Sequence, residues 1–96
     1  MDDRIYLINL YDYYGELLTL KQRKYFEYYY FDNLSLMEIG ENLSVSRNAV
    51  YKCLKEASLK LVFFEEKLLL YKKSIMIKDI ICDLDEDLQE RIKELI

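Results

Sequence analysis

The chain has 96 residues, of which 52% are apolar and 33% are charged. That length suits one domain, the apolar share excludes a disordered chain, and the interleaved charges exclude a membrane span. Histidine is absent and only two glycines occur, so the commonest general base, the best metal ligand and a glycine-rich phosphate loop are all missing. We therefore expect a protein that is not an enzyme and that has no cofactor or metal site.

The N-terminus and the cysteines indicate the compartment. Met1 is followed by Asp2 and Asp3, so no secretory signal is visible, and Cys53 and Cys82 are too far apart for a CxxC pair. We expect both cysteines to be reduced packing residues and the protein to be cytoplasmic.

The scarcity of helix breakers predicts an all-α fold, since the chain has no proline and no alternating strand pattern. A first helix is expected over residues 3–14, ended by Gly15. A second is expected over residues 20–31, where Thr19 and Gln22 form a capping box. The tyrosines of both segments could form a stacking platform for single-stranded nucleic acid. Because the first cluster is acidic rather than basic, core packing is the better account.

Residues 36–55 are predicted to form a helix-turn-helix. Ser35 and Glu38 form a capping box before the first helix, Leu34 and Ile39 have the spacing of a hydrophobic staple, and Ser46 is placed to cap the second helix. Gly40 stands where the helices would touch. The apolar positions expected to point inward are Ile39, Leu43, Val45, Val50 and Cys53.

The outer side of the second motif helix carries residue types that reach phosphates and base edges in a major groove. These candidate nucleic-acid-binding residues are Ser46, Arg47, Asn48, Tyr51, Lys52 and Lys55. The whole chain has a net charge of −4, but residues 46–60 carry +3, residues 21–31 carry +2 and residues 74–96 carry −4. The alternatives are an ordinary two-helix corner and lysines that merely form a solvated face.

The second motif helix is expected to continue far beyond the motif, because apolar residues recur there in steps of four and three. They are Val50, Leu54, Ala57, Leu61, Phe64, Leu68, Tyr71 and Ile75, with a second apolar surface at Val62, Phe63, Leu69 and Leu70. A helix apolar on several sides needs several partners. We expect a homodimer with an interface of Leu61, Phe64, Leu68, Tyr71 and Ile75; the alternative is burial within one compact bundle.

A last helix is expected over residues 84–96, after an acidic start that suits the N-terminal end of a helix dipole. The expected organisation is a helical domain over residues 1–60 that contains the motif, followed by a helical extension over residues 61–96 that serves dimerisation.

Four runs of sequence, residues 13–19, 21–23, 33–39 and 45–51, resemble the YlxM family, small bacterial proteins encoded beside components of the signal recognition particle. Residues 18–54 also resemble the fourth conserved region of sigma factors. The resemblance loosens after Lys73. It implies a DNA-binding regulator or, alternatively, a protein-interaction module or a binder of the particle's RNA, with particle components as partners. Gly40 stands where the motif more often has Ala and Ser44 where it more often has Gly, which predicts a weaker first helix and a strained turn.

Overall fold

The computed structural model describes residues 3–96, and the regular structure of this range is entirely helical. The elements are α1 (Arg4–Tyr14), η1 (Gly15–Leu17), α2 (Leu20–Tyr30), α3 (Leu36–Leu43), α4 (Arg47–Leu68), α5 (Leu70–Ile81) and α6 (Glu86–Lys93). The predicted all-α fold is confirmed. Residues Met1 and Asp2, on which the expected lack of a secretory signal partly rests, lie outside the described range. Within that range, each helix is too short or too polar to cross a lipid bilayer.

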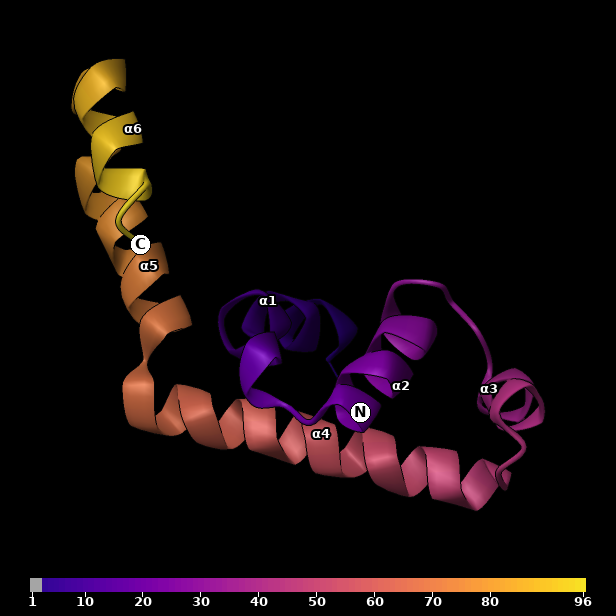
Figure 1. Cartoon of the computed structure of the whole chain (residues 1–96). Helices are drawn as coiled ribbons and strands as arrows, with labels where there is room; N and C mark the ends of the chain where they lie inside the picture. Colours follow the sequence, from indigo (N-terminus) through magenta and orange to yellow (C-terminus); the bar gives the residue numbers. More distant parts are fainter. Residues whose placement is uncertain (1–2) are drawn as a thin grey trace.

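The helices form an elongated body of 52 × 25 × 22 Å around α4 (Figure 1). Helices α1 and α2 pack across α4, and α3 lies beside its N-terminal end. At the other end of α4 the chain turns steeply into α5, and α6 folds back along α5. We refer to α5 and α6 together as the arm. The arm projects away from the rest of the body, so the two ends of α4 carry different structures.

Local capping fixes where the helices begin. The Thr19 and Gln22 side chains form the predicted capping box of α2, and Ser35 and Glu38 form that of α3. Asp3 caps α1, so this helix begins at Arg4, one residue later than predicted. Helix α2 ends one residue early, and α6 is shorter than the predicted range 84–96 at both ends. The last turn of a helix is held by few hydrogen bonds, so differences of one or two residues at helix ends are common.

Two clusters of buried side chains form the core. The larger joins α1, α2 and the middle of α4, and its fully buried members include Leu10, Tyr14, Phe26 and Leu61. The smaller joins α2, α3 and the first half of α4. The tyrosines of α1 and α2 are buried in these clusters or pack against them. Core packing of the tyrosines of these two segments is thus confirmed.

The main departure from the sequence pattern is a break in the long helix. The pattern predicts one helix from Ser46 through Ile75, yet α4 ends at Leu68 and α5 begins at Leu70. Leu69 has φ 57° and ψ 26°, in the left-handed region. The Glu65 carboxylate, only 5% exposed, folds over the break and accepts hydrogen bonds from the first turn of α5. Apolar spacing carries no information about such a polar contact.

The break divides the predicted apolar seam into two parts with different surroundings. Val50, Leu54, Ala57 and Leu61 are 0% exposed and belong to the core of this chain. Leu68 and Ile75 are exposed, while Phe64 and Tyr71 are half-buried. The boundary expected between residues 60 and 61 falls inside α4, so one continuous helix crosses it. The expectation that both cysteines are packing residues is wrong for Cys82, which is exposed on the arm.

Candidate nucleic-acid interface

The corner between α3 and α4 is built from local hydrogen bonds. The Ser35 and Glu38 side chains each accept from the other's backbone N–H, at 3.1 and 3.0 Å. At the end of α3, Ser44 adopts φ 57° and ψ 43°, and the Val45 N–H donates to the Gly40 carbonyl at 3.0 Å. A left-handed residue with this bond is the usual way to end a helix sharply. The positive-φ position predicted at Ser44 is therefore confirmed.

Gly40 permits the close approach that the sequence predicts. A Cβ atom there would lie 2.8 Å from the Val45 carbonyl oxygen and 3.6 Å from the Arg47 nitrogen. The first of these distances is a clash with backbone rather than with a flexible side chain. The absence of a side chain at Gly40 therefore brings the turn and the start of α4 against α3.

The inner side of the corner is apolar, as predicted, with one exception. Ile39, Val50 and Cys53 are buried together with Tyr25 and Leu54, and Leu43 is half-buried. Val45 is 37% exposed, so its predicted inward orientation is wrong. This residue lies in the turn before α4 begins, and its side chain therefore does not follow the helical spacing. Burial raises the pKa of the Cys53 thiol, which keeps it protonated and unreactive.

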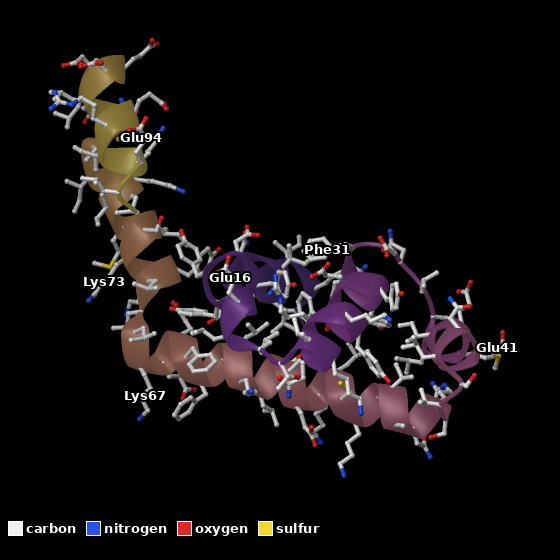
Figure 2. All side chains as sticks on the ribbon, viewed as in Figure 1. Glu16, Phe31, Glu41, Lys67, Lys73 and Glu94 are labelled. Atoms are coloured by element: carbon white, nitrogen blue, oxygen red, sulfur yellow. The ribbon has the colours of Figure 1, made fainter. Side chains whose placement is uncertain are left out.

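The first turns of α4 present the candidate residues to solvent. The Ser46 Oγ accepts from the Ala49 N–H at 3.1 Å and so caps the helix; its hydroxyl proton is still able to donate to a ligand. Positions 47, 48, 51, 52 and 55 are all exposed, and the Tyr51 side chain is 45% exposed. Figure 2 shows side chains projecting from the edge of α4 that faces away from α1 and α2. All six predicted residues are thus exposed at the N-terminal end of α4, and we call the surface that they form the α4 face.

A groove beside the α4 face adds a residue that sequence reasoning did not assign to the site. This groove between α2 and α4 has a volume of about 330 Å³. Lys21 from α2 and Lys52 from α4 both line it, and Glu56 supplies a carboxylate. The Lys21 ammonium lies 5.7 Å from the centre of the Tyr25 ring, a cation–π distance that restrains the side chain. The sequence showed the positive charge of residues 21–31, but it did not show that these residues would lie beside α4.

The charge of this region differs from that of the arm. The α4 face combines Arg47, Lys52 and Lys55 with the N-terminal end of a 22-residue helix, where the backbone dipole also favours anions. Residues 74–96 have a net charge of −4, and Lys72 and Lys73 at the start of α5 bring the net charge of residues 70–96 to −2. A polyanion approaching this molecule is therefore attracted more strongly to the α4 end than to the arm.

Comparison with known proteins identifies the family. The whole chain, residues 1–96, matches the family described as "Putative helix-turn-helix protein, YlxM / p13 like". The chain belongs to the YlxM/p13-like family. Three relatives, all described as UPF0122 proteins, differ in their identity to this chain and in the share of their length that it covers.

The relative from Thermoanaerobacter sp. (strain X514) is 54% identical over 72 residues, which are 75% of this chain and 62% of the relative. The relative from Caldanaerobacter subterraneus subsp. tengcongensis is 49% identical over 96 residues, or 99% of this chain and 74% of the relative. The relative from Ureaplasma urealyticum serovar 10 is 40% identical over 93 residues, which are 96% of this chain and 94% of the relative. The chain thus spans less than two thirds of the Thermoanaerobacter relative's length, while it spans nearly all of the Ureaplasma relative's. Membership of this helix-turn-helix family agrees with the corner between α3 and α4.

Proposed function

We propose that this chain is a cytoplasmic, non-enzymatic regulatory protein that binds nucleic acid, double-stranded DNA in the first instance, through the α4 face. The observation that carries the proposal is the corner itself. It fixes α3 against the start of α4, and Ser46 with five polar residues of α4 is exposed while the opposite side of α4 is buried. This is the geometry by which a helix-turn-helix inserts its second helix into a major groove.

The five larger side chains of the face have distinct roles in this proposal. Arg47 is long and planar, which suits a guanine edge or a phosphate, and Asn48 and Tyr51 have the groups to read base edges. Lys52 and Lys55 would neutralise phosphates, and Lys21 would add a further phosphate contact from α2. Phosphate contacts set affinity, whereas the base-edge contacts set sequence preference.

Binding should be weak for a single chain and strongly dependent on salt. The net charge of −4 opposes association with a polyanion, and only a few cations are available at the α4 face. The logarithm of affinity should fall linearly with the logarithm of salt concentration, with a slope of about −0.9 for each phosphate neutralised on duplex DNA.

A titration with matched charge reversals tests the proposal. Arg47→Glu with Lys52→Glu should abolish binding to duplex DNA fragments at low salt. The control, Lys67→Glu with Lys78→Glu, makes the same charge change on exposed lysines away from the α4 face and should weaken binding only slightly. Both double variants should keep the wild-type thermal midpoint, because exposed substitutions usually change stability by less than about 0.5 kcal/mol. Equal loss in both variants would mean that only net charge matters, and the α4 face would lose its role.

We also propose that two copies of the chain associate through the C-terminal part, which would double the contacts to nucleic acid. Leu68 is 46% and Ile75 49% exposed, and both belong to the interface predicted from sequence, together with the half-buried Phe64 and Tyr71. Leu61, predicted for the same interface, is buried in this chain's own core and is inaccessible to a second copy while this fold holds. Light scattering at tens of micromolar tests the proposal, and a monomer there would overturn it.

A second candidate is a protein-interaction module of the signal recognition particle pathway, or a binder of the particle's RNA. The observation that favours it is the arm, whose apolar residues Met76 and Ile80 are 52% and 74% exposed. The same titration performed with particle RNA separates the alternatives. Binding to the RNA and not to duplex DNA, lost in the Arg47 and Lys52 variant, would replace DNA by RNA as the ligand of the α4 face. If the protein binds neither duplex DNA nor the RNA, the protein-interaction module remains as the proposed function.

A further inference from the structure

The joint between α4 and α5 lies at Leu69, where the sequence gives no reason for a bend. No glycine or proline occurs after Gly40, and the residues on both sides of Leu69 are compatible with one continuous helix. Leu69 nevertheless has φ 57°, a left-handed conformation that is sterically unfavourable for leucine. A bend of this kind persists only when tertiary contacts compensate for its cost.

The compensation is a direct exchange of hydrogen bonds. In a continuous helix, the N–H groups of Leu70, Tyr71 and Lys72 would donate to the carbonyls four residues earlier. Here Leu70 donates to the Tyr14 hydroxyl at 3.0 Å, Tyr71 donates to Glu65 Oε1 at 3.1 Å, and Lys72 donates to Glu65 Oε2 at 3.0 Å. On either side of these three residues the helical pattern is intact, because Leu69 donates to the Glu65 carbonyl and Lys73 to the Leu69 carbonyl.

Two buried side chains therefore stand in for one turn of helix. The Tyr14 hydroxyl donates to Glu65 Oε1 at 2.6 Å, which fixes the carboxylate over the start of α5. Tyr14 is fully buried and Glu65 is 5% exposed, so the hydrogen bond between these two side chains is shielded from water. Helix α1 holds the bend from a second direction, since the rings of Tyr6 and Tyr13 lie 5.9 and 6.1 Å from that of Tyr71.

We propose that the α4–α5 joint is a two-state element. In the bent state the Tyr14–Glu65 pair caps α5; when this pair is released, α4 and α5 join into one helix and the arm swings away from α1. The same number of backbone N–H groups is satisfied in both states, so the side-chain pair and the aromatic contacts with α1 decide between them. The joint sets the direction of the arm relative to the α4 face, and it is independent of what that face binds.

A distance measurement between spin labels tests the joint. The labels are placed by Glu56→Cys on α4 and Lys78→Cys on α5, both exposed positions, after replacement of the native cysteines by Cys53→Ala and Cys82→Ser. In one continuous helix the labelled residues, 22 positions apart, would be separated by about 33 Å along the axis. The bent state should give a shorter distance, which the otherwise unaltered protein is expected to show.

The decisive variant is Glu65→Ala, with Glu66→Ala as its matched control at an exposed neighbouring position. Glu65→Ala should shift the distribution toward about 33 Å without loss of helical circular dichroism, since alanine favours helix. Glu66→Ala should keep the short distance. Adding Leu69→Gly to Glu65→Ala should restore part of the short population, because glycine adopts positive φ readily.

Two results would overturn the two-state joint. The first is an unchanged short distance in Glu65→Ala, which would mean that packing alone sets the bend. The second result concerns Tyr14→Phe, which is measured in case Glu65→Ala unfolds and loses its helical circular dichroism. Tyr14→Phe removes one hydroxyl and keeps the buried ring, and it should show a partial shift toward the long distance. A short distance in this folded variant would contradict the proposal.

Discussion

Replacing Leu61 by alanine separates two roles that the sequence pattern leaves equivalent. Leu61 and Leu68 both occupy the apolar seam, seven residues apart, yet Leu61 is 0% exposed among α1, α2 and α4 while Leu68 is 46% exposed. Truncating a fully buried leucine removes its transfer free energy and leaves a cavity, together about 3 kcal/mol. Truncating Leu68 should cost about 1 kcal/mol or less, because much of its surface is already in water.

The cost at Leu61 is large relative to the stability expected for a chain of this size, about 5–15 kcal/mol. Urea unfolding followed by circular dichroism measures it. With a slope of about 1.3 kcal/mol per molar urea, the Leu61→Ala midpoint should fall by about 2 M, against less than about 1 M for Leu68→Ala. The measurement is made at two protein concentrations at least thirtyfold apart.

The dependence of the Leu61→Ala effect on protein concentration tests whether Leu61 is a core residue or an interface residue. A core residue destabilises the chain by the same amount at both concentrations, whereas an interface residue acts through association. If the cost of Leu61→Ala vanishes on dilution, or is no larger than that of Leu68→Ala, then Leu61 belongs to a contact between chains. The conclusion that Leu61 is buried within a single chain would then be wrong.

Three further outcomes follow from the structure. Ser44→Gly should raise the free energy of unfolding by about 1 kcal/mol, because glycine adopts the left-handed conformation without strain; a lower thermal midpoint would contradict the turn geometry. Ser46→Ala should lower it by about 1 kcal/mol through loss of the hydrogen bond from the Ala49 N–H, and an unchanged midpoint would show that this cap contributes nothing. Burial, with the hydrogen bond to Glu65, raises the pKa of Tyr14 from 10.0 to about 12. The folded state thus holds the phenolic proton more tightly than the unfolded state, and stability present below pH 10.0 should be lost as the pH rises toward about 12. Tyr14→Phe should weaken this alkaline dependence, and equal slopes in both proteins would argue against it.

The sequence by itself determined the features that depend on residues close together in the chain. A capping box joins residues three positions apart, so Ser35 with Glu38 and Thr19 with Gln22 could be predicted and are present. The resemblance to the family implied the left-handed turn at Ser44, and the spacing of the two motif helices predicted the close contact at Gly40. Because these local signals define the corner between α3 and α4, the position of the candidate interface could be predicted as well.

Only the tertiary structure decided what happens at the far end of α4. Apolar spacing predicts a helix and an apolar side, but not which partner covers that side, so the seam could not distinguish Leu61 in the core from Leu68 at the surface. At the bend after Leu68, Glu65 is hydrogen-bonded to Tyr14, which lies 51 positions away in the chain. Lys21 likewise reaches the groove beside α4 only because α2 packs there. These features come from side chains that folding brings together, and the energies that fix them have no counterpart in local sequence.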